Sequence, residues 1–352
     1  MSRLNVKMIS LFASVGLVLA GCGTGAATKV EKKPEVKAAK QEQVSGKYYF
    51  TANEGGTISK VNVKDNKVAD TIKADGVVHN IQLSPDGKVV AATLIPESGH
   101  GHGGHEGGTS GKVVFYDAFT NELLKEVEVG NHPAHIVYSG DGKYVLATNN
   151  EDDTVSVIDA ATYKVIKTVP TGDGPHGFRI SPDSQFAYIA NMGEDTVSVI
   201  NLETFQEERM NIGSTPVTTG VTKDGKTLAV TLFSENSLAI VDLETKQVAK
   251  VEVGTGPAQV YIGPDSKYAY VANQGTEESP SSSMSIVDLE AKTVVDEIKT
   301  GNGAHGVTVS SDGKFAYVTN MFDNTVSIID LDSKQAETIE VGEIPNGITI
   351  MN

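Results

Sequence analysis

Histidine is the residue type whose chemistry and spacing are most informative in this chain of 352 residues, and three of its eight histidines recur in register. His79, His176 and His305 each stand seven residues before the aspartate of an Asp-Gly or Asp-Ser turn. Three neutral imidazoles suit zinc, copper, nickel or iron and leave one coordination position open. Because metal–nitrogen bonds are about 2.0–2.1 Å long, such a site requires the fold to bring the rings together. The alternative is that each histidine only hydrogen-bonds the backbone of a neighbouring repeat.

A second group of histidines lies in the glycine-rich segment 95–111. There, glycines separate His100, His102 and His105, a composition associated with metal binding. Their spacing fits no rigid zinc motif, so the segment predicts a labile transition-metal contact. A polar loop without a ligand is the alternative. His132 and His135 follow in the link toward the next repeat and are candidates to join this loop.

The elements that must position these histidines are short alternating apolar runs that return along the chain. The run Thr154–Asp159 reappears at 196–201 and 325–330, with weaker copies at 57–62, 112–117, 237–242 and 284–288. Four of the six steps between the closing Asp or Asn residues are 41 or 42 residues long. This period is typical of a four-stranded propeller blade. Asp-Gly pairs at 86–87, 141–142, 224–225 and 312–313 predict the tight turns between strands.

The two ends of the repeat region complement each other. Residues 346–352 match a first strand that has no second strand after it, and residues 47–53 match a second strand that lacks a first. Pairing these ends would close a ring and remove two open sheet edges. We therefore predict an all-β, seven-bladed propeller with four-stranded antiparallel blades. His79, His176 and His305 then start the innermost strands of blades 2, 4 and 7, with all eight histidines on one face.

The second strands carry a motif that identifies a family resemblance. Segments 49–53, 188–191, 270–273 and 317–320 resemble the signature of the YVTN repeat family of bacterial and archaeal surface or periplasmic β-propellers. The resemblance covers residues 47–352 and implies the fold. It does not select a function, because relatives include scaffolds, a DNA-binding periplasmic propeller and, more distantly, domains of nitrite and nitrous-oxide reductases.

The N-terminal segment predicts export. Arg3 and Lys7 precede an apolar stretch, residues 8–20, that is too short to span a bilayer comfortably. The segment ends Leu-Ala-Gly before Cys22, which resembles the lipobox of bacterial lipoproteins. We therefore expect residues 1–21 to be a signal peptide, Cys22 to be lipidated, and residues 22–46 to be a flexible tether on the outer face of the cell membrane. A plain secretory signal with an incidental cysteine is the alternative.

The amino-acid composition restricts the kinds of binding partner that we expect. Cys22 is the single cysteine, so disulfides and thiolate metal sites in the folded body are excluded. The net charge of −16 disfavours a nucleic-acid partner, whose affinity would come from basic side chains. We expect a monomer anchored to the membrane, with any protein or cell-wall partner on the histidine-bearing face.

These patterns support an extracytoplasmic binding protein for a transition metal or a metal-bearing ligand. A metal-independent interaction scaffold is the first alternative, and a propeller hydrolase or reductase-like enzyme is the second. The sequence has no Cys-x-x-Cys-His haem attachment, no tryptophan and no Gly-x-Ser-x-Gly elbow, which disfavours the enzyme. Asp159, Asp242 and Asp330 recur with the repeat and are expected to form turns, and Asn53, Asn191, Asn273 and Asn320 to cap loops.

Overall fold

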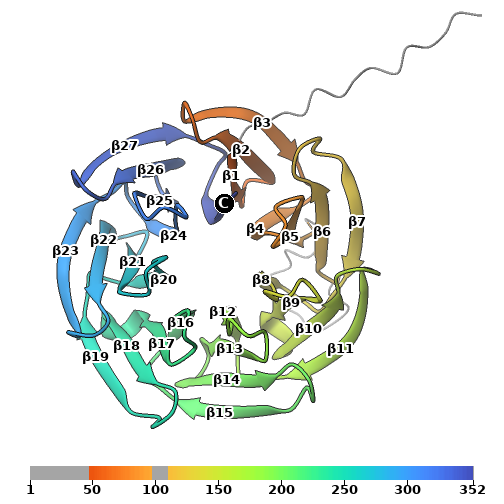
Figure 1. The fold of residues 1–352 in the computed structure, drawn as a ribbon. Helices are drawn as coiled ribbons and strands as arrows, with labels where there is room; N and C mark the ends of the chain where they lie inside the picture. Colours follow the sequence, from red (N-terminus) through yellow and green to blue (C-terminus); the bar gives the residue numbers. More distant parts are fainter. Residues whose placement is uncertain (1–46, 97–109, 352) are drawn as a thin grey trace, which may run out of the picture. The chain divides into compact units, whose positions relative to one another are not determined.

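The structure, a computed structural model, describes residues 47–96 and 110–351. The chain divides into two units, residues 1–43 and residues 44–352, and every described residue belongs to the second. In that unit, seven four-stranded antiparallel sheets form a ring (Figure 1). Each innermost strand contacts the innermost strands of both neighbouring sheets, which closes the ring. The prediction of a seven-bladed propeller is confirmed.

Each blade uses its strands in the same order from the axis outward. The innermost strands are β4 (Val77–Leu83), β8 (Pro133–Tyr138), β12 (Pro175–Ile180), β16 (Pro216–Val221), β20 (Pro257–Ile262), β24 (Ala304–Val309) and β28 (Pro345–Ile350). The second strands are β1 (Tyr48–Asn53), β5 (Val89–Ile95), β9 (Tyr144–Asn149), β13 (Phe186–Asn191), β17 (Thr227–Leu232), β21 (Tyr268–Gly275) and β25 (Phe315–Asn320). The third strands are β2 (Thr57–Asn62), β6 (Lys112–Asp117), β10 (Thr154–Asp159), β14 (Thr196–Asn201), β18 (Ser237–Asp242), β22 (Pro280–Asp288) and β26 (Thr325–Asp330). The outer strands are β3 (Lys67–Lys73), β7 (Leu123–Glu128), β11 (Lys164–Pro170), β15 (Glu207–Asn211), β19 (Val248–Glu252), β23 (Thr293–Lys299) and β27 (Gln335–Glu340). Two short 3₁₀ turns, Asn150–Asp152 and Phe233–Glu235, follow second strands.

The first blade is built from both ends of the described chain. Its strand order is β28-β1-β2-β3, and Tyr49 of β1 pairs with Ile350 of β28. The backbone N–H of Met351 donates to Tyr48 O at 2.9 Å. The predicted composite blade is therefore confirmed, and its pairing satisfies backbone groups that would otherwise be exposed at two open edges.

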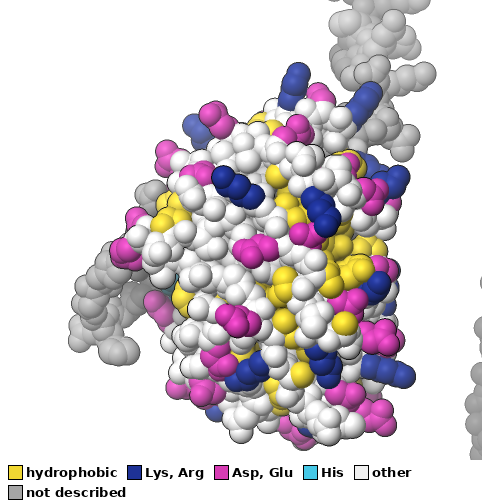
Figure 2. All heavy atoms as spheres, turned by 90° about the vertical axis from the view of Figure 1, so that its left-hand side faces the viewer, with side chains coloured by type: hydrophobic (Ala, Val, Ile, Leu, Met, Phe, Trp, Pro, Cys, Tyr) yellow, Lys and Arg dark blue, Asp and Glu magenta, His cyan; other side chains and the backbone are white. Residues whose placement is uncertain are grey.

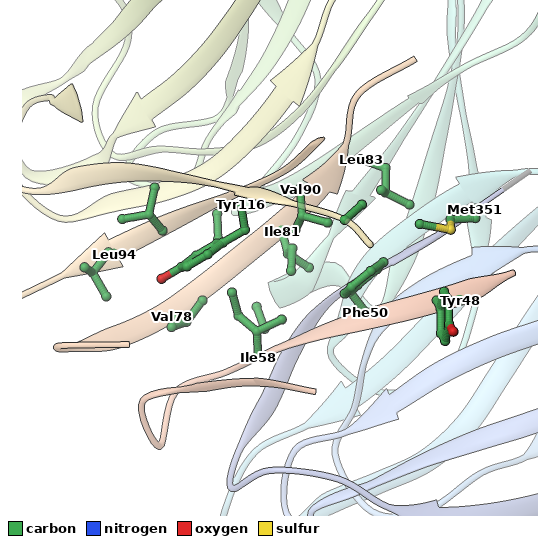
Figure 3. Close-up of a cluster of buried hydrophobic side chains, with 14 residues drawn as sticks. Tyr48, Phe50, Ile58, Val78, Ile81, Leu83, Val90, Leu94, Tyr116 and Met351 are labelled. Carbon is green, nitrogen blue, oxygen red and sulfur yellow. The ribbon is translucent and has the colours of Figure 1, made fainter. Parts of the chain in front are cut away.

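The hydrophobic core is divided into seven clusters, each between two neighbouring blades. In the cluster between blades 1 and 2, Phe50 and Ile58 pack toward Ile81 and Val90 (Figure 3). The side chains of Phe50, Ile58 and Val90 are fully buried. Since each blade buries its two faces against different neighbours, the ring as a whole must close before the core is complete.

The recurring polar residues have structural roles, as the sequence predicted. Asn53 Nδ2 donates to the hydroxyls of Thr57 and Ser59, both at 3.0 Å, and Asn149, Asn191, Asn273 and Asn320 make the same contacts in their blades. Asp159 accepts from the backbone N–H of Thr162 at 2.8 Å, and Asp242 and Asp330 act alike. The glycines of the four Asp-Gly turns have φ between 69° and 71°, a region that glycine adopts at little cost.

The outer rim carries charges of both signs. Figure 2 views the side that lies at the left of Figure 1, where β19, β23 and β27 run, and shows acidic and basic side chains interspersed with small apolar areas. Nothing in the described ranges forms a helix long and apolar enough to cross a membrane.

Candidate metal centre

The innermost strands share a local irregularity that positions the histidines. In β4, β8 and β12 the register with the second strand shifts close to the start of the strand. The shifted segments are 78–81, 133–136 and 175–178, and they contain His79, His135 and His176. A bulge of this kind turns side chains away from the regular alternation of a strand. The three rings are thus directed by backbone geometry that the repeat supplies.

His79, His135 and His176 lie together. One ligand atom of each can be chosen so that all three atoms lie within 4.8 Å of one another. The Nε2 atoms of His79 and His176 are 3.4 Å apart, and the ring centroids of His135 and His176 are 4.7 Å apart. Two nitrogens bound to one ion in tetrahedral geometry lie about 3.3–3.4 Å apart, as follows from metal–nitrogen bonds of about 2.0–2.1 Å.

Hydrogen bonds fix which nitrogen of each ring carries the proton. His176 Nδ1 lies 3.2 Å from Val217 O, and a carbonyl oxygen only accepts, so Nδ1 is the protonated atom. His79 Nδ1 lies 2.9 Å from Glu54 Oε1, which likewise accepts when ionised. With a proton on each Nδ1, the two facing Nε2 atoms share either a metal ion or one further proton. His135 Nε2 is buried and has no hydrogen-bond partner among the described residues.

Glu54 links the cluster to the closing blade. It follows β1, and its Oε1 also accepts from Asn346 Nδ2 of β28 at 2.7 Å. Burial alone would raise the pKa of Glu54, but the hydrogen bond and the charge of His79, together with the Asn346 amide, lower that pKa to about 2. The carboxylate is ionised, and it orients the His79 ring with Nε2 toward His176. A carboxylate that holds the far nitrogen of a histidine is the usual second layer of a metal site.

Burial keeps the other rings neutral. Burial, followed by the neighbouring His79 and His305, lowers the pKa of His176 to about 3. Burial and then His176 lower the pKa of His135 well below its ordinary value. Neutral imidazole is the form that binds a metal.

The structure changes one member of the trio that the sequence favoured. Even spacing around the ring suggested His79, His176 and His305, whereas the cluster contains His135 in place of His305. The reason is adjacency: β4, β8 and β12 are consecutive around the ring, while β28 stands between β24 and β4. His135 also belongs to β8 itself and not to the link before it.

His305 has partners of its own. Its Nδ1 lies 3.3 Å from Gln259 Nε2, and a hydrogen bond joins its ring to the backbone of Asn346. Burial is the main cause that lowers its pKa to about 4. His305 and, through Val217, His176 each hydrogen-bond the backbone of the next blade, and His176 does so while it also belongs to the cluster.

His132 lies at the edge of the cluster. Its ring centroid is 6.4 Å from that of His79, and its Nδ1 lies 3.5 Å from Glu151 Oε1. Its side chain is 42% exposed, so it is the most solvent-accessible of these rings. The predicted loop ligands His100, His102 and His105, and the lipidation site Cys22, lie outside the described residues.

Sequence reasoning missed Glu54. The residues that follow the second-strand motif in other blades are Asn150, Met192, Gln274 and Met321, so an acidic residue occurs at this position of blade 1 alone among these five. That departure from the repeat was the available signal. Its partner Asn346 lies in the segment 346–352 that the sequence assigns to a first strand, and spacing gave no sign of their contact.

Comparisons with known proteins give the family and the fold. The model of the YNCE-like β-propeller family matches residues 110–334. No curated protein matches the chain. A solved structure of hydrazine synthase from Kuenenia stuttgartiensis aligns with a TM-score of 0.68 at 22% identity, covering 77% of this chain and 89% of that one. The dihydro-heme d1 dehydrogenase NirN aligns with a TM-score of 0.61 at 14% identity, covering 86% and 74%. At these identities the two structures show the propeller fold.

Proposed function

The chain belongs to the YNCE-like β-propeller family, and we propose that it uses the propeller to bind a transition metal ion, alone or within a metal-bearing ligand, through His79, His135 and His176. One observation carries this proposal: the Nε2 atoms of His79 and His176 face each other at 3.4 Å, and the Nδ1 atom of each ring lies beside an acceptor oxygen. Lone pairs at that distance repel unless a cation lies between them. A buried, unpartnered third nitrogen on His135 supports the same reading.

The donor set indicates the class of metal. Three imidazoles without a thiolate suit zinc, copper, nickel or iron. Every nitrogen pair must come within about 4.2 Å, twice the bond length, to share an ion. A pair of nitrogens at the 4.8 Å limit of the cluster would have to approach by about half an ångström or more. A fourth position is left for water, for a ligand atom or for His132.

A proton is the competing occupant of this space. Were His79 doubly protonated, its Nε2 would donate to His176 Nε2, and Glu54 would pair with the resulting imidazolium. The two occupants differ in a measurable way, because only one of them brings an element that can be counted.

The test is elemental analysis of the full-length chain, purified in mild detergent without an affinity tag and without chelator. We expect close to one equivalent of metal per chain, and its loss when His79, His135 and His176 are all changed to alanine. The matched control is His305→Ala, which should retain the metal. Retention by the triple variant would move the site to the 100–105 segment. Wild-type protein that stays empty after dialysis against zinc, copper, nickel and ferrous ions would refute metal binding and leave an interaction scaffold.

We also propose that the protein is exported and tethered by lipid on Cys22. The support is the sequence alone: the basic start, the apolar stretch and the small residues before Cys22. Metabolic labelling with a radioactive fatty acid should mark the wild-type protein and leave Cys22→Ser unlabelled. An unlabelled wild type that is found free in the medium would contradict the tether.

A further inference from the structure

The two arginines of the described residues have contrasting surroundings. Arg209 on β15 is 46% exposed and lies within 3.4 Å of the carboxylates of Glu194 and Glu207. Arg179 is on the innermost strand β12, three residues after His176, and is half-buried. Within the described ranges no carboxylate lies within 4.0 Å of Arg179, although the chain has 45 acidic residues. Charges that are partly removed from water are normally paired, so a half-buried guanidinium with no carboxylate beside it is available to an anionic ligand.

The repeat uses the Arg179 position differently in other blades. Gln82 and Thr349 occupy the equivalent place, where each accepts a hydrogen bond from the backbone of the next blade, Tyr138 N at 2.7 Å and Leu83 N at 3.2 Å. A guanidinium has five N–H donors and accepts nothing, so Arg179 cannot take that structural role. Among the described residues it makes one hydrogen bond, which Nη1 donates to Phe178 O of its own strand at 2.9 Å.

The equivalent positions of the next two blades carry no carboxylate. They are Gly220 in blade 5 and Tyr261 in blade 6. After burial and the charges of His176 and His79, the charge of Arg179 also lowers the pKa of His135. Arg179 is therefore on the same strand as one member of the histidine cluster and within electrostatic reach of another.

We propose that Arg179 binds the oxyanion group, a carboxylate or a phosphate, of a small ligand that also coordinates the metal at His79, His135 and His176. This inference rests on the proposed metal site. Arg179 and His176 are three residues apart on one strand, or about 10 Å along the backbone at 3.3 Å per residue. The long arginine side chain can shorten that span, so an acid with two or three carbons suffices. A planar guanidinium pairs with carboxylate or phosphate through two parallel hydrogen bonds.

The experiment titrates malonate into the full-length chain loaded with Co²⁺, whose visible absorption reports a change of ligands. Phosphate and the uncharged malonamide are run as separate arms. We expect malonate or phosphate to perturb the Co²⁺ spectrum and malonamide to leave it unchanged. Arg179→Gln should lower the affinity for the anion at least tenfold. A tenfold loss corresponds to about 1.4 kcal/mol, which the loss of one hydrogen bond to a charged group can supply.

Controls separate this proposal from the one it rests on. Arg209→Gln should leave anion affinity unchanged, and Arg179→Lys, which keeps the charge and loses the planar fork, should lie between wild type and Arg179→Gln. Thermal unfolding followed by circular dichroism checks that the variants fold. Equal anion affinity in wild type and both Arg179 variants, with Co²⁺ bound normally, would overturn the anion site alone. Failure of Co²⁺ to bind the wild type would overturn both proposals.

Discussion

The innermost strands of blades 2–4 and of blades 5–7 have the same backbone conformation and differ in the hydrogen-bond partners of their polar side chains. In blade 5, Thr218 Oγ1 donates to Ala258 O at 3.2 Å and accepts from Val260 N at 3.1 Å. In blades 2–4 the equivalent region presents three imidazoles: the Nε2 atoms of His79 and His176 face each other at 3.4 Å, and the buried Nε2 of His135 has no hydrogen-bond partner among the described residues. Unpartnered buried side-chain atoms in blades 5 and 6, Ser237 Oγ and Asn273 Oδ1, lie on third and second strands. On the innermost strands of blades 2–7, His135 Nε2 is the buried side-chain atom left without a partner, and such an atom points to a ligand.

His135 against His305 gives the largest expected difference. Both are buried histidines of innermost strands, but the first is in the cluster and the second is bonded to Gln259 and Asn346. We expect His135→Ala to lower the metal affinity at least 100-fold, which corresponds to about 2.7 kcal/mol. His305→Ala should change that affinity less than threefold. Competition against a fluorescent zinc chelator measures both. Equal losses in the two variants would show that the cluster is not the binding site.

Glu54 gives the next largest effect. Its ionised carboxylate accepts from His79 Nδ1, and removing such a second-layer partner costs about 10- to 100-fold in metal affinity. Glu54→Gln should fall in that range, with the bound metal retaining the same number of nitrogen ligands by X-ray absorption. Glu151→Gln is the matched control, because Glu151 is 66% exposed beside His132. If Glu54→Gln bound metal as tightly as the wild type, the only role of the carboxylate would be its contact with Asn346 in the closing blade.

The fold was predictable because the same strand pattern recurs in every blade. Seven copies of one alternating run, a period near 42 and complementary chain ends together leave little choice of architecture. Strand boundaries moved by a few residues at most: the run expected at 284–288 belongs to a strand that begins earlier, Pro280–Asp288. Local patterning determines strands, and the blade-to-blade contacts follow from their order.

The membership of the site was less predictable, for two physical reasons. His135 is displaced by one residue from the position that His79 and His176 share, and only the bulge in β8 turns it into the cluster. Glu54 and Asn346 are 292 residues apart, and their contact exists only because the ring closes through their blade. Spacing along the chain carries no information on such a contact.

Thr218, on the innermost strand of blade 5, tests whether blades 5–7 affect stability without affecting metal binding. Thr218→Val removes the acceptor of the Val260 N–H in a buried setting, and leaving a donor unpaired there costs about 1–3 kcal/mol. We expect the free energy of unfolding in urea to fall by that amount while the metal affinity stays unchanged. Thr245→Val, at an exposed turn, should leave both quantities alone. A loss of metal affinity in Thr218→Val would show that the two halves are not separate in function.

The smallest expected effect is on the pH dependence of stability. Burial lowers the pKa of His305 from its ordinary 6.5 to about 4, so the unfolded chain takes up this proton at a higher pH than the folded protein does. The contribution of His305 to stability is therefore complete above pH 6.5 and is lost as pH falls toward 4. Between pH 7 and pH 5.5 the loss amounts to about 1 kcal/mol, as 1.36 kcal/mol per pKa unit implies.

His305→Gln isolates this contribution, because glutamine does not titrate. In metal-free protein, we expect the free energy of unfolding of the wild type to fall by about 1 kcal/mol more than that of His305→Gln over the same pH interval. A wild type that instead gained stability relative to His305→Gln as pH fell would mean that the folded protein holds His305 protonated, with a raised pKa. Its bonds to Gln259 and Asn346 would then be those of an imidazolium, and the innermost strands of blades 5–7 would carry a buried charge. That outcome would remove the contrast between the two halves on which the assignment of the ligand site depends.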